Sequence, residues 1–168
     1  MLKAEQRVVL LQHGGLADLS GKTGLTLLRY RRGPVVAVVD PEQAGRSLRQ
    51  VSGIDREVPV VASLAEAMAT GPEVAVIGLA PSGGRLPQAA RADVAAALRA
   101  GLSVASGLHS RIADDPELAA LRRDPAWIWD LRREPEGLRV AAARAAALPC
   151  RRLLAVGCLL YTSDAADE

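Results

Sequence analysis

Short apolar runs recur along the chain, with polar, helix-compatible segments between them. The runs are rich in Val, Leu and Ala, and within each run the apolar character is continuous rather than alternating. Such runs are typical of strands that are buried on both faces of a parallel sheet. The predicted strands are Arg7–Leu11, Val35–Val39, Val58–Ala62, Val74–Leu79, Leu102–Ser106, Ala126–Asp130 and Arg152–Val156.

Helix signals lie between these strands. Ser63 and Glu66 have the spacing of a capping box at a helix start. Apolar residues at helical spacing precede Gly101, which predicts a helix that ends at this glycine. Asp115 before Pro116 is typical of an N-cap followed by a first-turn proline. The alternation predicts an α/β fold of Rossmann-like type, with a doubly wound, mostly parallel sheet in three layers.

The composition is that of a globular protein, with 49% hydrophobic and 24% charged residues among 168. The basic residues are scattered and do not alternate with aromatic residues, so we expect no nucleic-acid partner. No apolar run is long enough to span a membrane, and no signal peptide is recognised, so no membrane partner is expected. Cys150 and Cys158 form no disulfide framework. These features predict a cytoplasmic protein.

The end of the sequence differs in character from the rest. The segment Cys158–Glu168 resembles the in-frame translation of a sequencing adapter, so we expect it to be a non-native tail. A native acidic tail is the alternative. The predicted organisation is a Rossmann-like N-terminal domain over residues 1–150, then the first strand of a missing C-terminal domain over residues 151–157.

Candidate chemistry is expected beyond the carboxyl ends of the strands, where open parallel sheets bind ligands. The strongest candidate follows the strand Val74–Leu79. The loop after this strand contains two glycines, which allow backbone amides to converge, and a helix begins after it. An arginine in the loop adds a forked guanidinium donor. Together these groups suit a carboxylate or a phosphate. A flexible turn is the alternative. The residues of this candidate anion site are Ser82, Gly83, Gly84 and Arg85.

Three further residues are candidates for ligand binding, and Asp40 and His109 are expected to lie in the same crevice as this loop. Lys22 stands at a helix start where it could meet an anion, but Leu16 occupies the glycine position that a phosphate-binding P-loop requires. Asp40 could bond a ribose hydroxyl or cap a short helix, and no dinucleotide glycine fingerprint accompanies it. His109 could act as an acid, base or donor, or be structural. Asp130 is expected to be a surface acid, and no metal site is predicted because the His and Cys residues lack companions at ligand spacing.

Five segments resemble one bacterial and archaeal family in order and spacing. The family includes D-glutamate N-acetyltransferases, and the resemblance covers essentially Met1–Gly157. Its most specific pieces are the loop APSGGRLP and the segment SGKTG. The segments are SGKTGLTLLRY (Ser20–Tyr30), AVVDPEQAGRSL (Ala37–Leu48), VIGLAPSGGRLP (Val76–Pro87), GLSVASGLHS (Gly101–Ser110) and LPCRRLLAVG (Leu148–Gly157).

The resemblance implies a two-domain protein with a Rossmann-like N-terminal domain and a P-loop-like C-terminal domain. It implies N-acetylation of an amino acid, with acetyl-CoA used by the intact protein and no cofactor held by the present chain. We expect the chain to be inactive alone, and its catalytic residues are not identified. A non-catalytic ligand-binding or dimerisation domain is the main alternative, with a homo-oligomer as one option, and a nicotinamide-dependent oxidoreductase domain is a third.

Overall fold

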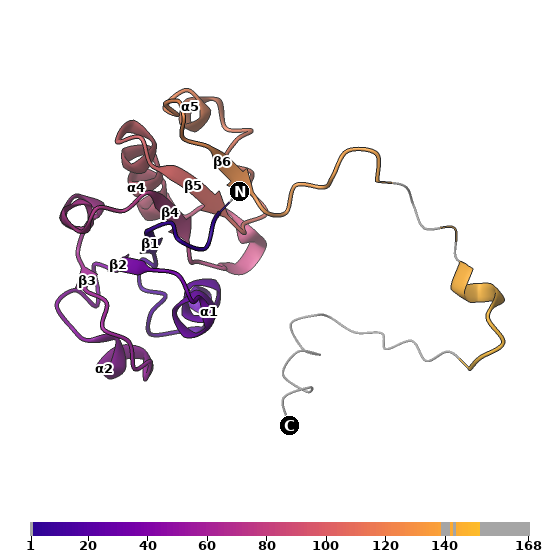
Figure 1. Ribbon diagram of the computed structural model, residues 1–168, viewed down its shortest axis with the longest axis horizontal. Coiled ribbons are helices and arrows are strands. Elements are labelled where there is room, and N and C mark those ends of the chain that lie inside the picture. Colours follow the sequence, from indigo (N-terminus) through magenta and orange to yellow (C-terminus); the bar gives the residue numbers. More distant parts are fainter. Residues whose placement is uncertain (1, 139–141, 143, 152–168) are drawn as a thin grey trace. The chain divides into compact units, whose positions relative to one another are not determined.

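The chain divides into two units (Figure 1). The computed structural model describes residues 2–138, 142 and 144–151. The first unit, Met1–Arg133, holds the sheet and its helices, and the second, Glu134–Glu168, contains the short 3-10 helix η4 (Arg144–Ala147). The predicted strand Arg152–Val156 and the predicted non-native tail Cys158–Glu168 lie outside the described residues.

Six parallel strands in the described part of the chain form one sheet, in the order β3-β2-β1-β4-β5-β6. The chain runs outward from β1 to β3 and then returns to place β4 on the other side of β1. The strand order therefore reverses between β1 and β4, which confirms the predicted doubly wound, Rossmann-like sheet. The strands are β1 (Val8–Leu11), β2 (Val35–Val39), β3 (Val60–Val61), β4 (Val74–Ile77), β5 (Ser103–Ser106) and β6 (Ile128–Asp130).

The edge strand β3 is shorter than the predicted Val58–Ala62. Pro59 has no N–H, and only its carbonyl joins the sheet, accepting the N–H of Val38 at 2.9 Å. Proline is tolerated at a sheet edge because the missing donor then costs no partner strand a hydrogen bond. The strand β2 coincides with its predicted bounds, β3 is three residues shorter than predicted, and the remaining four strands are shorter by one to two residues.

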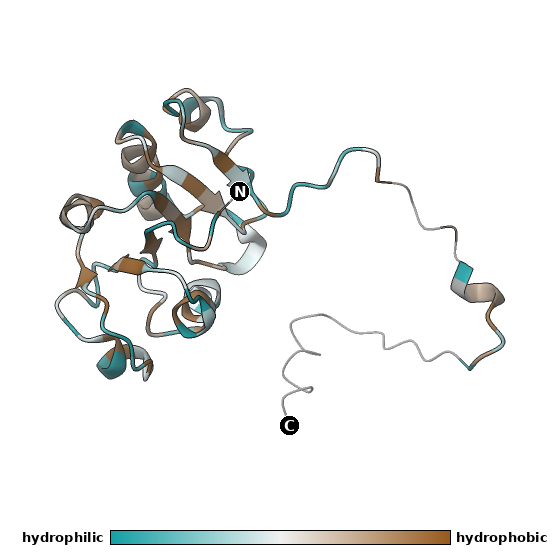
Figure 2. Cartoon of the chain, viewed as in Figure 1, coloured by the Kyte–Doolittle hydropathy of each residue, from teal (hydrophilic) through white to brown (hydrophobic). Residues whose placement is uncertain are grey.

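Two hydrophobic clusters form the core. The strands β1 and β2 are coloured as hydrophobic in Figure 2. Val9 and Leu11 of β1 belong to one cluster, with residues of α3, α4 and α5, whereas Val8 and Leu10 belong to the other, with residues of α1 and α2. This division explains the continuous apolar runs, because alternate residues of a strand point to opposite faces. The helices are α1 (Lys22–Tyr30), α2 (Leu48–Ser52), α3 (Leu64–Ala67), α4 (Gln88–Arg99) and α5 (Pro116–Ala119).

The helix ends follow the predicted capping residues. The Ser63 side chain accepts the N–H of Glu66 at the start of α3, and the Asp115 carboxylate accepts the N–H of Leu118 at the start of α5. Gly101 follows α4 with a φ of 83°, a left-handed conformation that favours glycine. None of the described helices is long and apolar enough to cross a membrane. The buried face of α4 comprises Ala90, Val94, Ala97 and Leu98.

Candidate functional site at the carboxyl edge of the sheet

The segment after β1 packs around Gln12, whose side chain is fully buried. Its Nε2 donates to the carbonyl of Gly21 at 3.2 Å. A Cβ atom on Gly24 would lie 2.3 Å from Gln12 Oε1, and one on Gly78 would lie 2.0 Å from the same oxygen. The glycines of the SGKTG segment therefore allow α1 to approach the sheet closely, a role that depends on Gln12 and was missed by the sequence analysis.

The first turns of α1 are bound to the end of β4. The N–H of Gly24 donates to the carbonyl of Gly78 at 2.9 Å, and the N–H of Ala80 donates to the carbonyl of Ser20 at 2.5 Å. In dinucleotide-binding Rossmann domains the amides at this helix start face the pyrophosphate instead. Here one of the first-turn amides, the N–H of Gly24, is already bonded to a protein carbonyl.

Asp40, at the end of β2, is fully buried and holds the segment that follows β1. Its Oδ1 accepts the N–H of Gly14 at 2.9 Å, and its Oδ2 accepts the N–H of Leu16 at 3.1 Å. The alternative that Asp40 caps a short helix is wrong, because residues 41–45 form turns and its carboxylate points to the β1 segment. A role of Asp40 in ligand binding stays a prediction.

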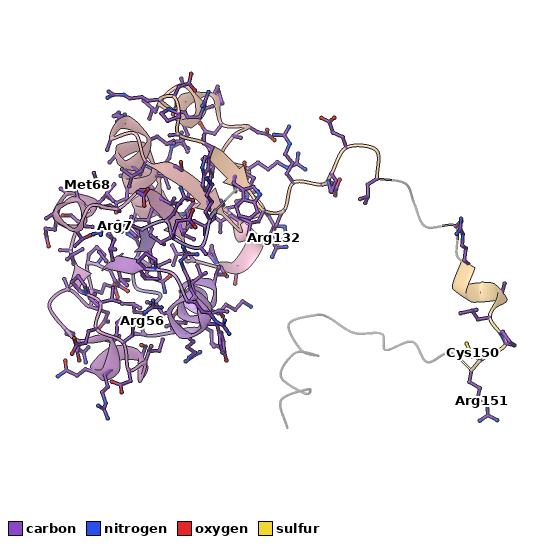
Figure 3. All side chains as sticks on the ribbon, viewed as in Figure 1. Arg7, Arg56, Met68, Arg132, Cys150 and Arg151 are labelled. Carbon is purple, nitrogen blue, oxygen red and sulfur yellow. The ribbon has the colours of Figure 1, made fainter. Side chains whose placement is uncertain are left out.

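Asp130, at the end of β6, repeats this arrangement beside β5. It was expected to be a surface acid, and this was wrong: the residue is 6% exposed. Its two carboxylate oxygens accept the N–H groups of Ile112 and Ala113, each at 2.9 Å. Arg132, labelled in Figure 3, donates from Nε to the carbonyl of Gly107 at 2.6 Å. Asp130, the last residue of β6, and Arg132, which follows that strand, thus hold the segment after β5 in place.

The segments after β4 and β5 meet at Gly84. Its carbonyl accepts the N–H groups of His109 at 2.9 Å and Ser110 at 3.1 Å. Gly84 has a φ of 61°, and a Cβ atom there would lie 2.0 Å from His109 Cδ2. Gly83 also has a positive φ, of 76°, in the short 3-10 helix η3 (Ser82–Gly84). The structure therefore places the predicted anion-binding loop and His109 side by side.

The surface of this loop is open to solvent. Ser82, Arg85 and His109 are all exposed. Among the described residues, no carboxylate lies within 4.0 Å of the Arg85 guanidinium. The helix α4 begins shortly after Arg85, and its N-cap residue Pro87 supplies no side-chain cap. The Arg85 guanidinium and the start of α4 therefore lie next to each other at the loop after β4, while the N–H of Gly84 donates to the carbonyl of Pro81.

Two predicted site residues do not join this loop. Asp40 is enclosed by the segment after β1, and Lys22 is exposed on α1, whose residues belong to the core cluster on the face away from α4. Within the described part of the chain, no hydrogen bond or ion pair links either residue to the Ser82–Arg85 loop. The structure thus brings Ser82, Gly83, Gly84, Arg85 and His109 together, and a site that these residues share with Lys22 or Asp40 stays a prediction.

A histidine and an aspartate near this edge were not recognised as a pair from the sequence. His13 Nε2 lies 3.0 Å from Asp93 Oδ2 of α4, with side chains 10% and 20% exposed. His13 has a φ of 39°, which turns the chain at the end of β1. A separation of 80 residues hides such a pair, and only the crossing of α4 over the end of β1 reveals it. No set of three or more metal-ligating side chains is found among the described residues.

The chain is similar to one family model and to two known proteins. A family model described as a domain of unknown function (DUF1611_N), Rossmann-like domain, matches residues 41–134. The crystal structure of a DUF1611 family protein from Anabaena variabilis superposes with a TM-score of 0.80 at 47% identity, covering 89% of this chain.

A D-glutamate N-acetyltransferase from Tritonibacter scottomollicae is 42% identical over 59 residues, or 35% of this chain. The chain spans 43% of the Anabaena protein, and the match covers 18% of the acetyltransferase. The family model covers more than half of the chain, and the likeness to the Anabaena structure extends over most of it. The chain therefore belongs to the DUF1611_N family of Rossmann-like domains.

Proposed function

We propose that this chain is the Rossmann-like, substrate-binding part of an enzyme that acetylates the amine of an amino acid such as D-glutamate. The observation that carries the proposal is the match of 42% identity to a D-glutamate N-acetyltransferase. That match covers a minor part of the relative, so the activity of the intact protein is part of the proposal.

The loop after β4 supplies the chemistry that an amino-acid carboxylate requires. The Arg85 guanidinium can form two parallel hydrogen bonds to a carboxylate, and it is exposed. The positive φ angles of Gly83 and Gly84 turn the backbone sharply between β4 and α4. His109 adjoins the same turn and adds a group that can donate or accept a proton.

The reaction follows from the chemistry of the two substrates. The amine nitrogen attacks the thioester carbonyl of acetyl-CoA, an amide C–N bond forms, the C–S bond breaks, and the thiol leaves. The amine must lose a proton, and the imidazole of His109 is the candidate acceptor at this edge. In the proposal, acetyl-CoA binds to the part of the intact protein that corresponds to the additional length of the relatives.

The proposal is tested by calorimetric titration of the chain with D-glutamate, acetyl-CoA and a nicotinamide dinucleotide. We expect D-glutamate to bind, and Arg85→Gln to weaken that binding tenfold to a hundredfold, because a charge-assisted hydrogen bond contributes about 1.5–3 kcal/mol. Arg99→Gln is the matched control, since Arg99 is exposed at the opposite end of α4.

The titrations distinguish the proposal from its alternatives by their outcomes. Failure of the wild-type chain to bind D-glutamate would contradict the proposal, as would equal affinities for wild type and Arg85→Gln. Tight dinucleotide binding would favour an oxidoreductase domain. Binding of D-glutamate without thiol release from acetyl-CoA is expected of the chain alone.

A further inference from the structure

A cleft lies where α1 passes beside β4, β5 and β6, and Gly107 and Leu131, which follow β5 and β6, also line it. It has a volume of about 430 Å³, within the range of small-molecule sites. Its walls are almost entirely apolar and include Leu27 of α1, Val76 of β4, Ala105 of β5 and Trp129 of β6. This cleft shares none of its lining with the Ser82–Arg85 loop.

The cleft exists because the helices divide unequally between the two faces. Residues of α3, α4 and α5 belong to the core cluster with Val104 of β5, whereas α1 and α2 alone of the described helices contribute to the other cluster. Trp127 and Trp129 are only partly buried in that second cluster. Their rings meet edge to face with centroids 6.4 Å apart, so Trp127 packs against the indole of Trp129 that lines the cleft.

One of the residues that line the cleft, Lys22, carries a positive charge. Lys22 lines the cleft and is exposed, and no carboxylate of the described residues lies within 4.0 Å of its ammonium. No acidic residue lines the cleft either. The Thr26 hydroxyl, which also lines it, already donates to the carbonyl of Lys22 at 2.8 Å. The charge of Lys22 is therefore available to a ligand.

We infer that this cleft binds a monocarboxylate with an apolar chain, such as a medium-chain acyl carboxylate. The single ammonium of Lys22 matches one negative charge, and apolar walls around Trp129 match a hydrocarbon body rather than a polar one. A dinucleotide carries more charge than this lining neutralises, and the nearby Gly24 amide is already bonded to Gly78. The inference is independent of the function proposed for the Arg85 loop.

Tryptophan fluorescence provides a direct readout, because the chain has two tryptophans. In Trp127→Phe, Trp129 is the single indole and reports on the cleft. Titration with butyrate, hexanoate, octanoate and decanoate should change its emission, with affinity rising up to about fourfold for each fully buried methylene. The neutral octanol and the cationic octylamine should bind more weakly than octanoate.

The role of charge is tested in the same background. Lys22→Gln should weaken octanoate binding about tenfold and leave octanol binding unchanged. Lys3→Gln is the matched control, because Lys3 is the other lysine of the chain and does not line the cleft. Equal octanoate affinities for these two variants would overturn the inference.

Other results would also overturn it. Affinity that does not increase with chain length would mean that the apolar walls are not the binding surface. A blue shift of Trp129 emission that depends on protein concentration, with no response to octanoate, would show instead that a second copy of the chain covers this face. Circular dichroism of each variant establishes that the fold is retained.

Discussion

At the scale of single residues, aspartates at strand ends hold neighbouring segments in place. Asp40 binds two N–H groups of the segment after β1, and Asp130 binds two of the segment after β5. Each carboxylate satisfies backbone donors that strand pairing cannot reach. Some arginines act similarly, since Arg56, labelled in Figure 3, donates to the carbonyls of Leu28, Arg31 and Gly33. Arg56 therefore stabilises the segment that follows α1.

We predict that Asp40→Asn destabilises the fold by about 1–3 kcal/mol. An asparagine oxygen can accept one of the two N–H groups, and its NH₂ group would face the other, which leaves that buried donor unpaired. The measurement is the urea unfolding midpoint. Asp55→Asn is the control: the Asp55 side chain is 85% exposed and forms a surface ion pair at 3.7 Å, so a change within about 0.5 kcal/mol is expected. An equally small effect of Asp40→Asn would contradict this role.

Whether the contacts of these aspartates and of Gln12 can be predicted from the sequence depends on how far along the chain their partners lie. Asp115 was identified as an N-cap because its partners lie within three residues of it. Asp40 and Gln12 were not assigned their contacts because those contacts join segments after different strands or depend on glycines elsewhere in the chain. Local chemistry is visible in a sequence, whereas contacts across the sheet require its strand order.

At the scale of elements, α4 and α5 are joined by an ion pair. Arg91 of α4 bonds both oxygens of Asp115, the N-cap of α5, and also reaches Glu117 at 2.8 Å. Hydrogen bonds from the Arg91 guanidinium, and then from the N–H of Leu118, lower the pKa of Asp115 from 3.8 to about 2. The same contacts raise the pKa of Arg91 above its ordinary value.

This shift predicts a pH dependence of stability. A carboxyl group whose pKa is lower in the folded state stabilises the fold fully above its unfolded pKa, and the effect is lost as pH falls through the folded pKa. The contribution of Asp115 should therefore be present above pH 4 and decline between pH 4 and pH 2. Asp115→Asn, which retains a capping side chain, should flatten the fall of unfolding free energy in this interval.

The measurement is urea unfolding of wild type, Asp115→Asn and Arg91→Gln at intervals between pH 7 and pH 2. Arg91→Gln should flatten the same interval, since it removes the main cause of the pKa shift. Wild type and Asp115→Asn with parallel profiles below pH 4 would show that this ion pair does not couple α4 to α5.

The positions of the strands could be predicted from the apolar runs, whereas the length of the edge strand β3 could not. The apolar runs located all six strands of the described sheet, because strands buried on both faces carry apolar residues continuously. The predicted length of β3 was too great, because Pro59, just before it, limits pairing at the sheet edge. Whether an apolar run forms a central or an edge strand depends on the order of the strands in the sheet.

At the scale of the whole molecule, the first unit carries two candidate binding regions. The Arg85 loop and His109 lie at the carboxyl edge, and the Lys22 cleft lies on the face covered in part by α1. The sequence predicted one crevice for the Arg85 loop, Asp40 and His109, and gave Lys22 only as a residue at a helix start that could meet an anion. The side of the sheet on which each helix packs is fixed by the direction of chain winding, which places α1 and α4 on opposite faces.

Residue-resolved amide NMR during a D-glutamate titration tests directly whether D-glutamate binds at the loop after β4, as proposed. We expect saturable shifts in the amide resonances of Ser82, Gly83, Gly84 and Arg85, with smaller shifts at His109 and Ser110, whose amides bond Gly84. In Arg85→Gln the same resonances should respond only at tenfold to hundredfold higher concentration. Shifts confined to Lys22 and Trp129, or no saturable shift at all, would show that D-glutamate does not bind at this loop.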